Sequence, residues 1–430
     1  MSKKKLLIIT YYWPPAGGPG VQRWLKFVKY LPQFNVHPIV YTPKNAAYPL
    51  LDDTLNKDLN QVDFTLIQKE INEPNQWMSK LFKKKTKTIS AGVIKPKEKQ
   101  SLLEKALLFI RGNFFIPDSR KTWVKPSIDF LKNYINQNPV DAIITTGPPH
   151  SMHLIGLALK KETGIPWIAD FRDPWYEINY QQELYLLNYA KKRHQTLELN
   201  VLQEANMLLT TSNATKKLLE QKTKSPITVI TNGYDDQKST VYKKDENFTL
   251  SHIGSLLSNR NPIILWKALA ELIKENSNFS QHFELKLIGK VSQDILDTLT
   301  AFGLIKHTQI IHYVSHEKAI KAQKESQVLL LIEENSEAGS YIIAGKLFEY
   351  LVSDTPILAI GPKVSDVKTI INETNTGKYF NYDEKEQLKN QLLNFFEAYE
   401  KNDLKNHPIG LQTYHRKALT QKLVNSIPWA

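Results

Sequence analysis

The sequence predicts an α/β protein built from two doubly wound domains in series. Short apolar runs, typical of buried parallel strands, alternate with stretches that carry apolar residues at helical spacing. The alternation begins again after a polar stretch in the middle of the chain. A chain of 430 residues is also long enough for two hydrophobic cores. Together these observations favour two parallel sheets, each covered by helices on both faces.

The first half of the chain is expected to form the first sheet. The expected strands are Lys5–Thr10, Pro38–Thr42, Asp141–Thr145, Pro166–Asp170, Leu208–Thr211 and Ile227–Thr231, and the expected helices are Val21–Leu31 and Met152–Lys161. The strand runs are short and apolar, as in strands that are buried on both faces. We place the first domain at residues 1–235.

The second half repeats the pattern after a polar linker at residues 236–247. The expected strands are Phe248–Ile253, Phe283–Ile288, Gln309–His312, Val328–Ile332 and Pro356–Ile360, and the expected helices are Pro262–Lys274 and Ala344–Val352. We place the second domain at residues 248–410. A helix within residues 411–430 is expected to pack back on the first domain.

Composition and charge exclude several classes of protein. The chain has no cysteine, which excludes disulfides, thiolate zinc sites and a thiol nucleophile. No run reaches the roughly 18 apolar residues that cross a membrane, and the apolar stretch near the N-terminus is too short for a signal peptide. The formal net charge of +13 predicts an anionic partner: nucleic acid, acidic lipid or a phosphorylated metabolite.

A basic, amphipathic insertion is expected at about residues 76–126 of the first domain. Five lysines lie beside two aromatic residues, and an apolar stripe at helical spacing follows them. The lysines are Lys80, Lys83, Lys84, Lys85 and Lys87, the aromatics Trp77 and Phe82, and the stripe Leu102, Leu103, Ala106, Leu107, Ile110 and Phe114. This pattern favours a helix that lies on an anionic membrane surface. A solvated loop followed by a helix packed on the domain is the alternative.

The glycine-rich loop AGGPG, residues 16–20, separates the first expected strand from the first expected helix. Such a loop lets main chain approach a ligand, usually a phosphate. It does not fit a dinucleotide site, because Arg23 stands at the third glycine position and the second strand ends in Thr42 rather than an acidic residue. No P-loop pattern occurs. A tight turn without a ligand is the alternative.

The stretch SYIIAGKLFEYLVSDTPILAIGP, residues 340–362, carries the second candidate site. Lys346 and Glu349 share one helix face near an expected helix start, where free N–H groups suit a diphosphate. The carboxylate of Glu349 could accept from both hydroxyls of a ribose. A simple ion pair between the two residues is the alternative. Gly254 and Ser255 follow an expected strand, and Arg260 could hold phosphate oxygens.

Metal-ligand patterns are scarce. The sequence has no D-x-D pair. His150 and His153 stand three residues apart, but two histidines fall short of the three or four ligands of a zinc site. We therefore expect no metal and no cofactor.

Four motifs resemble those of GT-B glycosyltransferases in the large retaining family often called family 4, which includes bacterial cell-surface sugar transferases. They are AGGPG in residues 16–20, TTGPPHSMHLIG and IPWIADFRDPW in residues 145–175, NGYD in residues 232–235 and GKLFEYLVSDTPILAIG in residues 345–361. They follow the family's order along nearly the whole chain. The resemblance implies a GT-B fold with a ligand cleft between the domains.

The resemblance also implies roles for individual residues. Donor binding would involve Gly18, Gly254, Ser255, Arg260, Lys346 and Glu349, catalysis His150, Arg260 and Lys346, and the acceptor side Arg172 and Asp173. Glu349 matches the second glutamate of the family's E-x7-E pair, which holds the donor ribose. The first glutamate is replaced by Tyr341, and Glu337 lies nearby. This departure leaves the identity of the sugar open.

The resemblance implies a retaining, metal-independent glycosyltransferase. It would move a sugar from a nucleotide-diphosphate donor, expected to carry UDP or GDP, to a glycan or lipid-linked acceptor in surface polysaccharide synthesis. The expected location is cytoplasmic, on the inner face of the membrane, because of the basic insertion. A non-hydrolysing nucleotide-sugar epimerase and a silent sugar-nucleotide-binding subunit stay open as alternatives. Nucleic acid is not expected as a partner, because aromatic and basic residues do not interleave along a strand.

Overall fold

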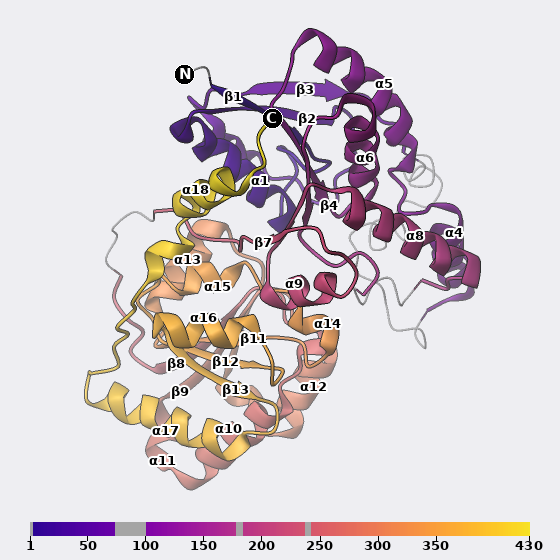
Figure 1. Ribbon diagram of the computed structural model, residues 1–430. Helices are drawn as coiled ribbons and strands as arrows, with labels where there is room; N and C mark the ends of the chain where they lie inside the picture. Colours follow the sequence, from indigo (N-terminus) through magenta and orange to yellow (C-terminus); the bar gives the residue numbers. More distant parts are fainter. Residues whose placement is uncertain (1–2, 74–99, 178–183, 237–241) are drawn as a thin grey trace. The chain divides into compact units, whose positions relative to one another are not determined.

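The computed structural model describes residues 3–73, 100–177, 184–236 and 242–430. The chain divides into two units (Figure 1). Unit 1 comprises Met1–Thr231 and Arg416–Ala430, and unit 2 comprises Asn232–His415. Each unit contains one parallel sheet, so the predicted fold class of two doubly wound α/β domains is confirmed.

Unit 1 has a seven-stranded sheet in the order β3-β2-β1-β4-β5-β6-β7. The strands are β1 (Lys4–Ile9), β2 (Val36–Pro43), β3 (Thr65–Lys69), β4 (Ala142–Gly147), β5 (Trp167–Phe171), β6 (Met207–Thr210) and β7 (Ile227–Val229). The helices are α1 (Pro19–Tyr30), α4 (Leu102–Phe114), α5 (Lys121–Gln137), α6 (Ser151–Thr163), α8 (Asn188–Glu204), α9 (Asn213–Glu220) and α18 (Arg416–Ser426). Alternate strand residues feed two cores, one under α1 and α18 and one under α5 and α6.

Unit 2 has a six-stranded sheet in the order β10-β9-β8-β11-β12-β13. The strands are β8 (Phe248–Ile253), β9 (Phe283–Ile288), β10 (Thr308–Ile311), β11 (Val328–Ile332), β12 (Ile357–Gly361) and β13 (Gly377–Asn381). The helices are α10 (Ile263–Glu275), α11 (Ser277–His282), α12 (Gln293–Ala301), α13 (His316–Glu325), α14 (Glu337–Ser340), α15 (Lys346–Tyr350), α16 (Asp366–Thr374) and α17 (Lys385–Glu400). Its sheet also separates two apolar cores.

The C-terminal segment packs on unit 1. Leu419, Leu423 and Ile427 are buried in the core that also contains Trp24 and Val28 of α1. The chain thus leaves unit 1 after Thr231 and returns to it at Arg416. Packing therefore divides the chain a few residues away from the boundaries expected at 235 and 411.

Each sheet has a topological switch point, where chain connections leave in opposite directions. In unit 1 it lies between β1 and β4, and in unit 2 between β8 and β11. Ligands of open α/β sheets bind outside the carboxyl ends of the strands at this point. The predicted glycine loop follows β1, and Gly254 follows β8, so both candidate sites lie at switch points.

Two details differ from the sequence prediction. The expected helix Ala344–Val352 is shortened to Lys346–Tyr350, so little more than one turn of helix dipole is present. Lysines 80–87 lie outside the described residues, whereas the apolar stripe of the insertion forms α4. No helix in the described ranges is long and apolar enough to cross a membrane.

Candidate functional site

Gly254 begins the site in unit 2, directly after β8. Its backbone has φ +117°, a conformation that favours glycine. A Cβ atom at this position would lie 2.9 Å from Nζ of Lys346. The backbone conformation favours glycine here, and the missing side chain lets the lysine approach closely. The structure brings these two predicted residues together at the switch point.

Lys346 is partly buried and hydrogen-bonded to a histidine. Its Nζ lies 3.2 Å from Nε2 of His252, whose Nδ1 lies 3.1 Å from the carbonyl oxygen of Leu330. Since a charged lysine can only donate, Nε2 accepts and the histidine proton is on Nδ1. Burial, followed by the charge of Arg260, lowers the pKa of Lys346 to about 7.

Arg260 ends a 3₁₀ turn at Ser258–Arg260, after the exposed Ser255. Its charge acts on both Lys346 and His252. Neither Lys346 nor Arg260 forms an ion pair with a carboxylate in the parts of the chain that the structure describes. Two neighbouring cations without a carboxylate partner make a site for an anion, and guanidinium geometry suits phosphate oxygens.

Glu333 is a buried carboxyl directly after β11, on the other side of the switch point. Its Oε2 accepts from Oγ of Ser365 at 2.7 Å and from the hydroxyl of Tyr379 at 2.9 Å. Burial raises the pKa of Glu333 to about 7, while the charge of Arg260 opposes that shift. Sequence reasoning missed this residue. The signal available was a glutamate immediately after an apolar strand.

Glu349 does not pair with Lys346 by a salt bridge. Its Oε1 lies 3.1 Å from Nε2 of His316, and its Oε2 accepts from Nε2 of Gln323 at 3.0 Å. Both partners belong to α13. The His316 side chain is 65% exposed, whereas Gln323 is buried. The Oε1 side of this carboxylate is therefore the side that a ligand can reach by displacing an exposed partner.

Tyr341 and Glu337 form a linked pair. The Tyr341 hydroxyl donates to Oε1 of Glu337 at 2.9 Å. The tyrosine is 8% exposed, and the glutamate is exposed at the start of α14. The residue at the expected first-glutamate position therefore holds a carboxylate four residues earlier in the chain.

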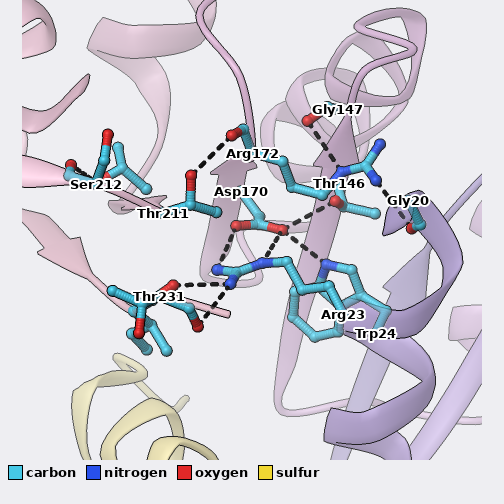
Figure 2. A network of polar contacts seen from close by, with 12 residues as sticks. Gly20, Arg23, Trp24, Thr146, Gly147, Asp170, Arg172, Thr211, Ser212 and Thr231 are labelled. Carbon is cyan, nitrogen blue, oxygen red and sulfur yellow. Dashed lines mark hydrogen bonds and ion pairs between the residues drawn. The ribbon is translucent and has the colours of Figure 1, made fainter. Parts of the chain in front are cut away.

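In unit 1 the loops at the switch point are held by Arg172, which follows β5. Its NH1 donates to the carbonyl oxygen of Gly20 at 2.9 Å, and its Nε donates to that of Gly147 at 3.3 Å. NH2 donates to the carbonyl oxygen of Pro148. Figure 2 shows this guanidinium reaching toward Gly20 and Gly147. Arg172 thus has a structural role, because it joins the loop after β1 to the loop after β4. Its acceptor-side role stays a prediction.

A fully buried ion pair supports the same loops. Arg23 of α1 contacts Asp170 of β5 twice, from NH2 to Oδ1 at 2.9 Å and from Nε to Oδ2 at 3.1 Å. Nε1 of Trp24 and Oγ1 of Thr146 also donate to Oδ2, at 2.7 and 2.9 Å (Figure 2). The arginine that replaces the third glycine of a dinucleotide motif is therefore a structural anchor.

His150 follows β4 and precedes α6. It is 5% exposed, and its ring stacks on Trp175 with centroids 4.6 Å apart. Burial lowers the pKa of His150 well below its usual range, so the ring is neutral. Gly18, at φ +94°, ends the glycine loop at the start of α1. Asp173 is partly buried, and burial raises the pKa of its carboxyl.

A metal centre is not assembled by these residues. The described residues contain no group of three or more histidine, aspartate or glutamate side chains placed to hold a metal ion.

Comparisons with known proteins agree with this arrangement. Residues 92–238 match the model of Glycosyltransferase Family 4. Sucrose-phosphate synthase from Thermosynechococcus elongatus has a TM-score of 0.62 at 13% identity, covering 98% of each chain. A glycosyltransferase from Rickettsia africae ESF-5 has a TM-score of 0.58 at 14% identity, covering 99% of this chain and 95% of that one. WaaG, a glycosyltransferase involved in lipopolysaccharide biosynthesis, has a TM-score of 0.56 at 14% identity, covering 98% and 99%. No curated protein matches by sequence.

The fold and the family match define the class of protein. Two doubly wound α/β units are the architecture that this chain shares with these structures. The chain has the GT-B fold, and its residues 92–238 match a glycosyltransferase family model.

Proposed function

We propose that the protein is a retaining glycosyltransferase that needs no metal ion and uses a nucleotide-diphosphate sugar. The observation that carries this proposal is the pair of cations Lys346 and Arg260, which form no ion pair with a carboxylate among the described residues and lie at the switch point of unit 2. A diphosphate supplies the missing negative charge. Lys346 and Arg260 would then provide the charge compensation that a divalent cation supplies in other transferases.

The reaction would be a front-face substitution. The bond between the anomeric carbon and the diphosphate oxygen breaks, and a bond from that carbon to an acceptor oxygen forms on the same face. The proton of the acceptor hydroxyl passes to the departing phosphate. Lys346 and Arg260 would stabilise the charge that grows on the diphosphate, and His150 would hydrogen-bond the transferred sugar. Glu349 would accept from the ribose through its Oε1 side.

The test combines donor binding with product analysis. UDP, GDP, ADP and CMP sugars are screened by thermal unfolding, where a donor at 100 times its Kd stabilises by about 2.7 kcal/mol. The donor that stabilises is then used for transfer in EDTA, and the anomeric configuration of the product is determined by NMR. Stabilisation by one donor and a product of unchanged configuration are expected. Turnover that EDTA abolishes and Mg²⁺ restores would overturn the metal-free mechanism, and an inverted product would overturn the retaining one.

A lipid-linked acceptor is the proposed partner in unit 1. Support comes from α4, where Leu102 and Phe114 are 85% and 63% exposed and Leu103 and Ile110 are also exposed. This apolar surface follows the lysine-rich segment in the chain. Apolar and basic groups together give reversible binding to anionic membranes, here the inner face of the cytoplasmic membrane.

Vesicle co-sedimentation tests the lipid-linked proposal. Wild type is compared with a variant in which Lys83, Lys84, Lys85 and Lys87 are changed to glutamine, and with a second variant in which Leu102 and Phe114 are changed to serine. Binding to anionic vesicles should fall in both variants and weaken with salt. Equal pelleting of all three proteins, independent of salt, would contradict a membrane-bound acceptor.

A further inference from the structure

Three histidines in unit 1 are buried and have an unsatisfied ring nitrogen. They are His150, His153 and His194, and the nitrogens are Nδ1 of His150 and Nε2 of the other two. None of these atoms has a hydrogen-bond partner among the described residues. Buried polar atoms in proteins are nearly always paired, so each exception needs a physical reason. For two of the three, the surrounding geometry supplies one.

The tautomer of His153 follows from a chain of hydrogen bonds across the sheet. Nε1 of Trp167 on β5 donates to Oγ1 of Thr145 on β4 at 2.9 Å. The same Oγ1 lies 2.8 Å from Nδ1 of His153 on α6. If Nδ1 were the donor, the hydroxyl hydrogen of the buried Thr145 would have no acceptor. Thr145 therefore donates to Nδ1, and the proton of His153 is on Nε2.

Nε2 of His153 lies near Nδ1 of His150. A Cβ atom placed on Gly147 would lie 2.6 Å from Nε2 of His153 and 2.8 Å from Nδ1 of His150. The two unsatisfied nitrogens thus flank one point beside Gly147, and they are no farther apart than two hydrogen-bond lengths. A small ring movement brings them into direct hydrogen-bond contact. Only glycine at position 147 leaves room for this approach.

We infer that Thr145 and His153 are positioning residues that hold the proton of His150 on its Nε2 atom. When the ring movement joins the two atoms, Nε2–H of His153 donates and Nδ1 of His150 accepts. His150 then has its proton on the opposite side of the ring. Burial lowers the pKa of His153 to about 3 and that of His150 well below its usual range, so both rings stay neutral and the tautomers persist at physiological pH.

The inference specifies what His150 recognises and rests, in this step, on the proposed function. A ring with its proton on Nε2 is a hydrogen-bond donor at that atom and cannot accept there. The sugar atom that meets it must therefore be an acceptor, such as the oxygen of a hydroxyl or of a phosphate. The rings of Trp175 and Phe171 fix the ring planes, by stacking on His150 and His153 respectively.

Nitrogen NMR of protein labelled with ¹⁵N in histidine tests the tautomers directly, because protonated and bare ring nitrogens resonate in separate ranges. In the wild type, His150 and His153 should both be protonated on Nε2. A proton on Nδ1 of either ring would overturn the inference without any mutation. In His153→Glu the carboxylate faces His150 as an acceptor and should move its proton to Nδ1, whereas His153→Gln keeps a donor and should leave it on Nε2. An unchanged His150 pattern in His153→Glu would also overturn it.

Matched variants separate positioning from folding. His37→Glu and His37→Gln alter a histidine of unit 1 that contacts Thr65 rather than Gly147 or Trp175, and they should leave the tautomer of His150 unchanged. Thr145→Ser should preserve the wild-type pattern. Thr145→Val removes the hydroxyl that donates to Nδ1, so the proton of His153 should no longer be confined to Nε2. Identical spectra for the serine and valine variants would contradict the relay.

Kinetics then connects the tautomer to the reaction. The kcat of sugar transfer should fall at least tenfold in His153→Glu and much less in His153→Gln, with the KM for the donor little changed. A changed tautomer with unchanged kcat would overturn the role of His150 in the reaction while leaving the relay intact. If no sugar transfer is found at all, the proposed function fails, and the NMR result still decides the relay.

Discussion

The switch points of the two units carry charge in opposite ways. In unit 1, Arg23 and Asp170 form an ion pair, and the guanidinium of Arg172 donates hydrogen bonds to three backbone carbonyl oxygens. In unit 2, Lys346 and Arg260 have no carboxylate partner among the described residues. A buried charge that is paired and hydrogen-bonded holds a structure together, whereas neighbouring cations without a counter-charge weaken the fold and await an anion. The charges of unit 1 therefore hold the loops of the site in place, whereas those of unit 2 are suited to binding the anionic part of a ligand.

Asp170→Asn should give the largest effect, on stability. The substitution leaves Arg23 charged, buried and without its counter-ion, and breaking such a pair costs about 3–5 kcal/mol. The free energy of unfolding is measured with urea. Asp63→Asn is the matched control, because Asp63 also forms an ion pair, with Lys3 at 2.8 Å, but on the surface. An equally small loss in both variants would contradict the structural role of the unit 1 pair.

Lys346→Met and Arg260→Gln should have the opposite signature. Each should weaken donor binding by about 1.5–3 kcal/mol, the scale of a hydrogen bond to a charged group. Arg260→Gln should leave the free energy of unfolding unchanged, since Arg260 forms no ion pair among the described residues. Lys346→Met also removes the hydrogen bond to Nε2 of His252 and should lower the free energy of unfolding by about 1–3 kcal/mol. Calorimetry with the donor and urea unfolding measure the two quantities. Lys306→Met, which changes an exposed lysine of unit 2, serves as control. A loss of stability without a loss of affinity would assign these cations to the fold.

Glu349→Gln should lower donor affinity by roughly 1.5–3 kcal/mol, because the amide is a weaker acceptor for ribose hydroxyls. His316→Ala should leave affinity unchanged or raise it, since it frees Oε1 of the carboxylate. Both affinities are measured by calorimetry. If both variants lose stability and keep full affinity, Glu349 only connects α15 to α13, and the ribose role is wrong.

Over the first pH unit above pH 7, the pH dependence of donor binding should be the smallest effect. Burial lowers the pKa of Lys346 from its ordinary 10.5 to about 7, so in the free protein the lysine is charged below pH 7 and loses its proton above it. Affinity should be highest below pH 7 and fall by up to tenfold per pH unit above it, because binding must then restore the proton. Without donor, stability should rise between pH 7 and 10.5, where the unfolded chain binds more protons than the folded one.

Two variants isolate the lysine from Glu333, whose pKa burial raises to about 7 and whose ionisation would also disfavour an anion. Lys346→Arg, which cannot lose its proton, should flatten the pH dependence of donor affinity. Glu333→Gln should keep the fall in affinity that deprotonation of Lys346 causes. A profile that Lys346→Arg does not change would assign the titration to another group.

The sequence prediction gave the observed bounds for three strands in the interior of the unit 2 sheet. Phe248–Ile253, Phe283–Ile288 and Val328–Ile332 begin and end as predicted. All three lie inside the sheet; Val328–Ile332 is a continuous apolar run, and in the other two strands polar residues stand between the apolar ones. Strands β3 and β13 were not predicted. Both lie at sheet edges, where lysine, glutamine and asparagine interrupt the apolar pattern.

The candidate site was predictable where residues follow strand ends or share a helix. Gly254 follows β8 and lies beside Nζ of Lys346, and the charge of Arg260 acts on the same lysine. The partners of Glu349 were not predictable, because His316 and Gln323 precede it by 33 and 26 residues and reach it through tertiary packing. The hydrogen bonds of Arg172 were not predictable either, since its partners are backbone carbonyl oxygens, which every residue has. The Tyr341–Glu337 contact did have a signal, a spacing of four residues.

The return of the chain to unit 1 sets an order on its synthesis. Unit 2 lies wholly between Thr231 and Arg416, and its two ends meet where Tyr234 pairs with His415. Leu419, Leu423 and Ile427, which belong to the core beneath α1, leave the ribosome after unit 2. Synthesis of unit 1 therefore begins before that of unit 2, and its core is completed only after unit 2 has been made. Until then the apolar face of α1 that packs against α18 stays uncovered, which favours aggregation of the nascent chain. Truncation before Arg416 should therefore destabilise unit 1 rather than unit 2.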